Sequence, residues 1–170
     1  MTEKDGKPKV LVLMGSDNDY DTVSPSWEIL RGFGVQVRVE VTSAHRSPSR
    51  TQEIVKRSEE DGVEVIIAAA GYAAHLAGQV ASATTLPVIG IPLDSSPLRG
   101  LDSLLSTVMM PAGIPVATVT VGKGGAKNAA YLALSILSIK YDRLRSDLRD
   151  FRASLEKGLS RLTEELNDKG

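Results

Sequence analysis

The chain of 170 residues contains no cysteine. Disulfide bonds and thiolate metal sites are therefore excluded, and a reducing compartment is allowed. Aromatic residues are also scarce at 4%, with a single tryptophan, Trp27. This scarcity disfavours a flavin carrier, because few rings are available to stack on an isoalloxazine.

Excess charge and long apolar runs are missing as well. The net charge is −1 at pH 7, which gives no electrostatic footprint for nucleic acid or an anionic membrane surface. No apolar run reaches the length of a transmembrane helix. Residues 1–9 are charged and lack the apolar core of a signal peptide. We therefore expect a cytoplasmic globular protein that binds neither nucleic acid nor membrane.

The residues that are present predict one α/β domain. Hydrophobic residues make up 42% of the chain and charged residues 24%, which is ordinary for a globular domain. Short apolar runs predict strands at residues 10–14, 35–41, 63–69, 88–91 and 116–121. Runs of Val and Ile suit strands covered on both faces, and helical patterns fill the gaps between them. This alternation predicts a parallel, doubly wound sheet.

Serine–proline pairs and one apolar stretch predict the helices. Ser24 with Pro25, and Ser47 with Pro48, each resemble an N-cap followed by proline at the first helical position. Residues 128–141 form a strongly apolar helix, which we expect to be buried on most sides.

The last segment, residues 142–170, is highly charged but carries an apolar seam. Its apolar residues recur at spacings of three and four, at Leu144, Leu148, Phe151, Leu155, Leu159, Leu162 and Leu166. The spacing predicts an amphipathic helix that docks on its own domain or on another subunit. The chain then divides into a tail (1–9), an α/β domain (10–141) and a C-terminal helix (142–170).

Ligands of doubly wound sheets bind beyond the carboxyl ends of the strands, and three loops there are unusual. The first, residues 15–19, holds Ser16 and Asp19. Its small and polar residues leave backbone N–H groups free for an anion. An ordinary turn with an Asp helix cap is the alternative.

The second loop, residues 43–48, places His45 beside Arg46. An arginine can hold a phosphate by paired hydrogen bonds, and a histidine can exchange protons near neutral pH. A lone histidine is often structural, so that alternative stays open.

The third loop, residues 70–78, consists almost wholly of small residues around His75. Small side chains let a ligand or a neighbouring chain approach the backbone closely. Tight helix packing is the alternative for its alanines. Both histidines of the chain fall on these loops.

A fourth segment, residues 122–127, is rich in glycine and follows the last predicted strand. It does not match the dinucleotide fingerprint, because Lys127 stands where the last glycine belongs. No GxxxxGK[ST] phosphate loop is present either. We interpret this segment mainly as a helix start, with anion contact as the alternative.

Together these motifs resemble the AIR carboxylase family. The resemblance rests on the sequences MGSDND, SAHRSP, AGYAAHLAG, GLDSLLSTVMMPAGIPVATVTVG and GGAKNAAYLALSIL. It runs from about Val10 to Tyr141. Members that use free carbon dioxide typically resemble SAHK and lack the histidine of the third loop. Arg46 and His75 therefore favour the form that moves a carboxylate within its substrate.

The resemblance implies a flavodoxin-like, single-domain, three-layer fold and assembly as a homo-octamer. It also implies an isomerase of purine synthesis that needs no cofactor and no metal. A carbamate on the 5-amino nitrogen of an imidazole ribonucleotide would yield a carboxylate on ring carbon 4, with carbon dioxide as a trapped intermediate. A closed pocket that excludes water would hold the reactants together.

The resemblance also implies roles for individual residues. His45 would move protons at the ring carbon, and His75 would belong with it to the catalytic pocket. The remaining residues would bind substrate: Ser16, Asp19, Ser43, Ala44, Arg46, Ala70, Gly71 and Leu76. Among these, Ser16, Ser43 and Arg46 would hold the phosphate, Asp19 the ribose hydroxyls, and the loop 70–76 the carboxylate.

Some positions depart from the family pattern. Tyr72 and Ala77 stand where glycine and proline are common, Met109 stands where glutamine is common, and Pro25 lies in the region of the first helix. The departures affect the carboxylate pocket rather than the proton-transfer and phosphate residues. A direct carboxylase that uses free carbon dioxide, and a non-catalytic nucleotide-binding domain, are the alternative functions.

Overall fold

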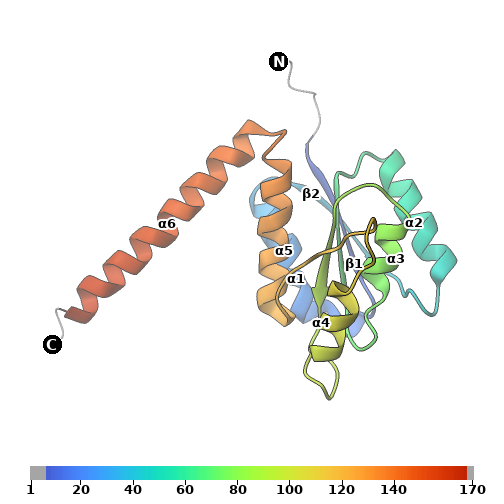
Figure 1. Cartoon of the computed structure of the whole chain (residues 1–170). Helices are drawn as coiled ribbons and strands as arrows, with labels where there is room; N and C mark the ends of the chain where they lie inside the picture. The colour runs from blue at the N-terminus through green and yellow to red at the C-terminus, as the bar shows by residue number, and fades with distance from the viewer. Residues whose placement is uncertain (1–6, 168–170) are drawn as a thin grey trace.

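The computed structural model describes residues 7–167, with a five-stranded parallel sheet at their centre (Figure 1). The strand order is β2-β1-β3-β4-β5, which is the order of flavodoxin-like folds. The strands are β1 (Lys9–Met14), β2 (Gln36–Val41), β3 (Val65–Ala70), β4 (Val88–Pro92) and β5 (Ala117–Thr118). The predicted parallel α/β fold is therefore confirmed.

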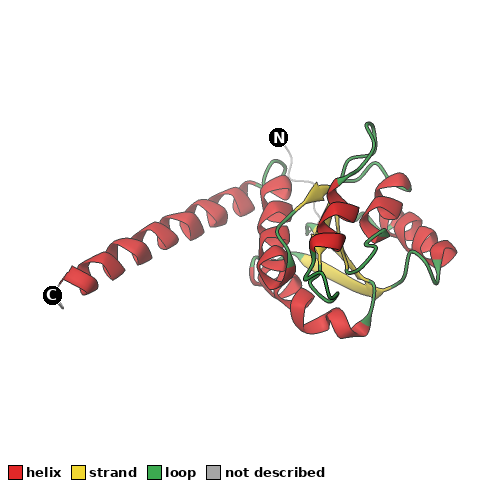
Figure 2. Cartoon of the chain, turned by 60° about the horizontal axis from the view of Figure 1, so that its bottom comes forward, coloured by secondary structure: helices red, strands yellow, loops and turns green. Residues whose placement is uncertain are grey.

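Helices cover both faces of the sheet and complete three layers (Figure 2). One face carries α1 (Tyr20–Gly32), α5 (Gly122–Leu137) and the start of α6 (Asp142–Asn167). The other face carries α2 (Pro48–Glu60) and α3 (Leu76–Ser82). The helix α4 (Leu101–Val108) contacts β4 and β5, and the short 3-10 helix η1 (Asp17–Asp19) follows β1.

The alternation of side chains along β1 explains why the sheet is buried on both faces. Val10 and Val12 belong to the apolar cluster under α1 and α5, whereas Leu11 and Leu13 belong to the cluster under α2 and α3. Each of these residues is at most 1% exposed. A strand with period-two side chains that are apolar on both faces can lie only inside a covered sheet.

The boundaries of several elements differ from those predicted. The apolar helix predicted at 128–141 is α5, which runs from Gly122 to Leu137. Ser24 and Pro25 do not begin a helix, because Pro25 lies inside α1, which starts at Tyr20 directly after η1. Proline lacks a backbone N–H, so α1 tolerates it at the loss of one hydrogen bond. The strand predicted at 116–121 is also shorter, since only Ala117 and Thr118 pair with β4. Ser47 and Pro48 begin α2 as predicted.

The glycine-rich segment 122–127 forms the first turns of α5, as its interpretation as a helix start predicts. Gly125 is required there by close packing. A Cβ at this position would overlap the carbonyl oxygen of Thr120 and lie 3.4 Å from Ile91 of β4. At the neighbouring Gly124, a Cβ would make only an ordinary contact with the Thr120 methyl group.

The helix α6 is docked at its start and leaves the domain after that (Figure 1). Leu144 and Leu148 are buried in the core beside α5. Phe151 stacks on Tyr131 of α5 with the ring centroids 4.6 Å apart. Further along the seam, Leu155, Leu159 and Leu166 are between 53% and 69% exposed. The side chain of Leu162 lies outside the described residues, as do residues 1–6 and 168–170.

Within residues 7–167, no helix combines the length and the apolar character needed to cross a membrane.

We expect Gly125→Ala to destabilise the domain and Gly124→Ala not to. The added methyl group at Gly125 meets backbone rather than a movable side chain, and overpacking of this kind costs about 1–3 kcal/mol. Alanine at Gly124 should be neutral or stabilise α5 by up to about 1 kcal/mol. Thermal unfolding of both variants tests the difference, and equal melting temperatures would contradict the packing argument.

Candidate active site

A cavity of about 570 Å³ lies where the loops after β1, β2 and β3 meet, at the carboxyl ends of the strands. The structure brings together every residue that the sequence analysis placed in a site: Ser16, Asp19, Ser43, Ala44, His45, Arg46, Ala70, Gly71, His75 and Leu76. Gly15, Asn18 and Ser95 also line the cavity and were not assigned to it, whereas Tyr72 and Ala73 belong to the loop 70–76 that was expected to hold the carboxylate. Parallel strands explain the convergence, since their carboxyl ends share one edge.

The loop after β1 turns tightly into η1 and presents polar groups to the cavity. The Ser16 hydroxyl accepts a hydrogen bond from the Asn18 N–H at 3.3 Å and donates to Asp17 at 3.1 Å. Asp19 is half-buried, and burial raises the pKa of its carboxyl above the usual value of 3.8. A backbone hydrogen bond with Ser16 opposes this rise, and the nearby Asp17 charge adds to it.

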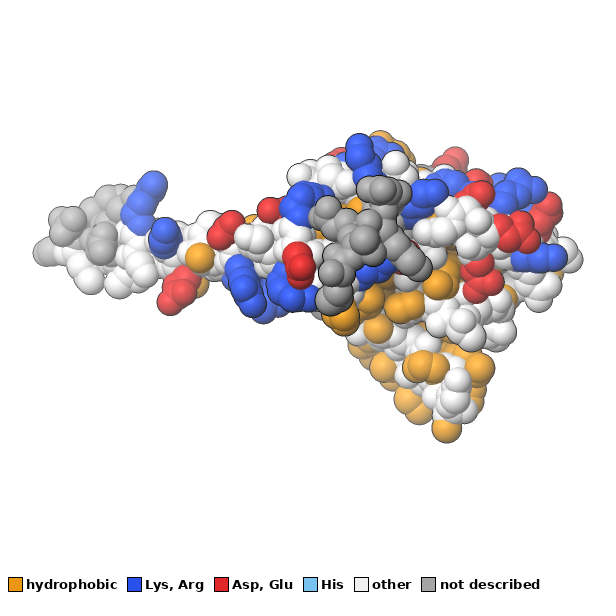
Figure 3. Space-filling model, turned by 90° about the horizontal axis from the view of Figure 1, so that it is seen from above, with side chains coloured by type: hydrophobic (Ala, Val, Ile, Leu, Met, Phe, Trp, Pro, Cys, Tyr) orange, Lys and Arg blue, Asp and Glu red, His pale blue; other side chains and the backbone are white. Residues whose placement is uncertain are grey.

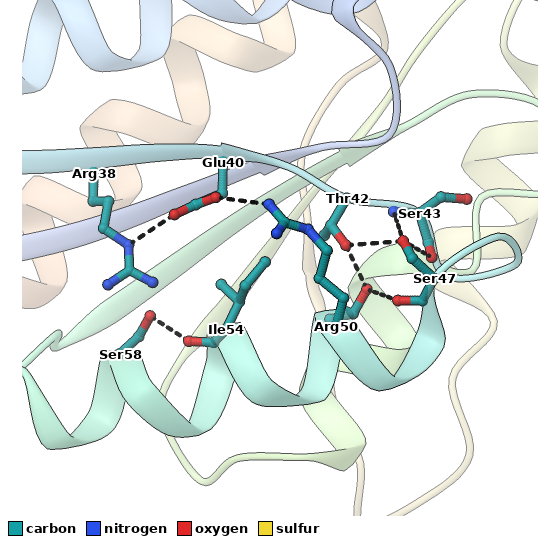
Figure 4. Close-up of polar contacts among 9 residues, drawn as sticks. Arg38, Glu40, Thr42, Ser43, Ser47, Arg50, Ile54 and Ser58 are labelled. Atoms are coloured by element: carbon teal, nitrogen blue, oxygen red, sulfur yellow. Dashed lines mark hydrogen bonds and ion pairs between the residues drawn. The ribbon is translucent and has the colours of Figure 1, made fainter.

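The loop after β2 is tied to α2 by a group of hydroxyls (Figure 4). The Ser47 hydroxyl accepts from the backbone N–H of Ser43 at 3.2 Å and donates to the Ser43 carbonyl at 3.2 Å. Thr42 and Thr51 are 2.9 Å apart through their hydroxyls and are almost fully buried. These bonds hold the two ends of a short loop together, and His45 and Arg46 lie on this loop beyond the strand ends.

Arg46 connects the first two loops. Its Nη2 donates to the Gly15 carbonyl at 3.1 Å, and its backbone N–H donates to the Ser43 hydroxyl at 3.2 Å. A guanidinium has five N–H donors in a planar fork, so one bond to Gly15 leaves others for a ligand. The arrangement places a fixed positive charge beside Ser16 at the cavity wall.

His45 and His75 touch across the cavity. The Nε2 atom of His45 lies 2.6 Å from Nδ1 of His75, and the rings meet edge to face at 84°. One of these nitrogens must carry the proton and the other must accept, because an imidazole nitrogen is either a donor or an acceptor. The contact joins the loop after β2 to the loop after β3. Sequence spacing could not show it, since the residues are 30 positions apart.

Two buried side chains anchor the loop after β3 in the core, and Ser95 lies beside this loop. Ala74 and Leu76 are each 2% exposed. A Cβ at Gly71 would overlap the Ser95 hydroxyl, which would then have to turn away, so the loops after β3 and β4 lie close together here. Ser95 comes from the loop after β4, in which the sequence analysis found no motif.

No group of three or more His, Cys, Asp or Glu side chains that could hold a metal ion occurs in the part of the chain that the structure describes. The cavity instead offers an arginine, two histidines, hydroxyls and a backbone of small residues. Such a set can bind an anionic ligand and exchange protons with it.

The fold and the cavity define a flavodoxin-like α/β protein with a small-molecule site at its strand ends. The family model described as AIR carboxylase matches residues 9–158. The chain belongs to the AIR carboxylase family.

Curated relatives and a solved structure agree with this family. The N5-carboxyaminoimidazole ribonucleotide mutase of Pyrococcus horikoshii is 52% identical over 165 residues, which are 95% of this chain and 92% of the relative. The mutase of Escherichia coli is 45% identical over 152 residues, or 89% of this chain and 90% of the relative. The crystal structure of PurE from Treponema denticola has a TM-score of 0.83 at 27% identity, covering 91% of this chain and 96% of its own.

Proposed function

We propose that this protein is an isomerase that moves a carboxylate from the 5-amino nitrogen to ring carbon 4 of an aminoimidazole ribonucleotide. The product, 4-carboxy-5-aminoimidazole ribonucleotide, serves de novo purine (IMP) synthesis. The names of relatives at 45–55% identity support this activity. The observation that carries it in the structure is the contact of His45 with His75 inside a cavity that Arg46 also lines.

The cavity has a polar end and a small-residue end, which suits the two ends of this substrate. Arg46, Ser16 and Ser43 bind the phosphate, because they gather N–H and O–H donors around one point of the wall. Asp19 accepts hydrogen bonds from the ribose hydroxyls. The imidazole ring then extends toward Ala44 and the histidines.

The carboxylate end is formed by Ala70, Gly71 and Leu76, together with His75. Small side chains and backbone leave room for carbon dioxide but offer it no nucleophile. Exclusion of water here keeps the released gas beside the ring, so that recombination is effectively intramolecular.

The reaction needs only one residue to carry protons, because His45 first gives a proton and later takes one back. Protonated His45 gives a proton to the 5-amino nitrogen as the carbamate N–C bond breaks, which leaves carbon dioxide and a neutral amine. The amine and ring form an enamine, whose carbon 4 attacks the trapped carbon dioxide and forms the new C–C bond. His45 then takes the proton from carbon 4, and aromaticity returns. Proton transfer needs no cofactor, and His75 orients the His45 ring through their hydrogen bond.

The alternative functions are less well supported. A direct carboxylase would add free carbon dioxide to the same ring, but the curated relatives carry the mutase name. A non-catalytic nucleotide-binding domain would not require two histidines in contact within the cavity. Incubation with the carbamate, and separately with the decarboxylated nucleotide plus bicarbonate, distinguishes the three by which mixture yields the carbon-4 acid.

The protein also assembles as a homo-oligomer in this proposal, and the octamer implied by the family resemblance is the specific expectation. Exposed apolar surface supports assembly. Leu101, Leu105 and Val108 of α4, with Met109 after it, are 47% to 77% exposed. Figure 3 shows hydrophobic side chains gathered at one end of the domain. Burying such side chains contributes roughly 1.5–3 kcal/mol each, so a second copy is a favourable cover.

The cytoplasm is the proposed location. The substrate and product carry a phosphate, and such charged metabolites do not cross a membrane unaided because burying a charge in an apolar medium is costly.

His45→Asn should retain the fold and nucleotide binding but lose nearly all turnover. Positioned proton transfer is worth roughly 10²–10⁴-fold in rate, and asparagine cannot supply it. His75→Asn should lose less, and the double variant should lose no more than His45→Asn, because His75 acts through His45. Product formation from the carbamate measures each rate. Near-normal turnover in His45→Asn would remove it from the proton-transfer role.

Arg46→Ala should weaken binding of 5-aminoimidazole ribonucleotide but not of the riboside without its phosphate. A hydrogen bond to a charged group is worth about 1.5–3 kcal/mol, which is roughly tenfold to a hundredfold in affinity. Arg50→Ala is the matched control, because Arg50 pairs with Glu40 beside the same loop. Calorimetry with the nucleotide, and separately with the riboside, measures the two affinities for each variant. An equal loss for nucleotide and riboside would assign Arg46 another role.

Two truncations separate the docking part of α6 from its exposed part. Deletion of 142–170 should lower stability, because it removes Leu144 and Leu148 from the core. Deletion of 154–170 should leave the core intact and lower the subunit count, since Leu155 and Leu159 are exposed in one chain. Light scattering with size exclusion and thermal unfolding measure both effects. A monomeric full-length protein would refute the oligomer, and an unchanged melting temperature for the longer deletion would refute docking.

A further inference from the structure

Tyr72 is held in an unfavourable backbone conformation at the cavity. Its φ is +54°, in the left-handed region that a residue with a bulky side chain rarely adopts. The neighbouring residues limit the freedom of this backbone, because Ala74 and Leu76 are each 2% exposed. Glycine would occupy the position without strain. The tyrosine ring therefore has a role that offsets the cost of its backbone conformation.

The Tyr72 ring is also free of intramolecular anchors. Its residue lines the cavity and is 58% exposed. Among residues 7–167, no hydrogen bond or ring contact holds its side chain, in contrast to Tyr131 and Tyr141. The stability of the single chain does not explain why a residue with an unfavourable φ carries an aromatic ring that makes no anchoring contact.

The rest of the third loop cannot cover the cavity. Gly71 and Ala73 are too small, Leu76 is committed to the core, and His75 is bonded to His45. Tyr72 is the one large side chain of this loop that can turn over the bound ligand. Its ring has both the area and the apolar faces needed to exclude water from the carboxylate end.

We propose that the Tyr72 ring closes over the carboxylate end of the cavity and retains the carbon dioxide released there. This inference rests on the proposed function. The ring forms no bond to the substrate. It lowers the probability that carbon dioxide, once the N–C bond has broken, leaves the cavity before carbon 4 attacks it.

The test measures how much of the released carbon dioxide stays. The full-length protein receives carbamate labelled with ¹³C in its carboxylate, in a buffer with excess unlabelled bicarbonate, and mass spectrometry gives the labelled fraction of the carbon-4 acid. Spontaneous loss of label from the free carbamate is subtracted from a sample without protein. We expect wild type to retain most of the label and Tyr72→Gly to lose several-fold more of it, with more decarboxylated nucleotide released per turnover.

Two variants control for strain and for the hydroxyl. Tyr72→Phe keeps the ring and should retain label as wild type does. Arg99→Gly relieves the other non-glycine residue of positive φ, 50°, which does not line the cavity, and should also leave retention unchanged. Tyr72→Gly should melt no lower than wild type, because its backbone strain is removed.

The remaining outcomes overturn specific statements. Equal label retention in Tyr72→Gly and wild type overturns the role of Tyr72, as does a fall in subunit count with unchanged retention, which would make it an interface residue. Loss of label in Tyr72→Phe as large as in Tyr72→Gly overturns the role of the ring. Failure of wild type to convert the carbamate at all overturns the proposed function itself.

Discussion

The site depends on backbone hydrogen bonds that continue the sheet pairing past the ends of the strands. Thr42 N donates to Met14 O at 3.0 Å, Gly15 N to Ala69 O at 3.2 Å, and Leu93 N to Ala70 O at 3.0 Å. Each bond joins the first residues of one loop to a neighbouring strand. The loops after β1, β2 and β4 therefore start from fixed positions, and together with the loop after β3 they line one cavity.

Sequence reasoning located the loops of the cavity because parallel strands leave few choices, whereas most of the individual binding residues came from the family resemblance. Once the apolar runs are assigned as parallel strands, the loops that follow them must share one edge. Polar and small residues in those loops, such as Ser16, His45 and Gly71, then identify the wall of the site. The helix start at Ser47 and Pro48 was predicted correctly for a different reason. An N-cap signal is local and needs no tertiary information.

The parts that sequence reasoning missed depend on contacts between distant segments. Ser95 lines the cavity because its loop lies beside Gly71, and neither residue signals this alone. The orientation of His45 toward His75 depends on ring rotamers. Pro25 shows the opposite case, in which a strong local signal for a helix start is overridden, because η1 already begins the helical turn upstream.

Polar contacts hold the loop that carries His45 on both of its sides. On one side of the loop, β2 faces α2 through polar groups, including the hydroxyls of Thr42 and Ser47, which lie 3.3 Å apart (Figure 4). On the other side, Arg46 reaches the Gly15 carbonyl. Hydrogen bonds weaken steeply when donor and acceptor move out of line, whereas the hydrophobic effect has no preferred direction. A proton-transfer residue needs a fixed orientation, since a small displacement of the reacting groups lowers the rate strongly. The polar support of this loop therefore serves the geometry of His45 more than the stability of the sheet, which the apolar residues of β1 and β3 already supply.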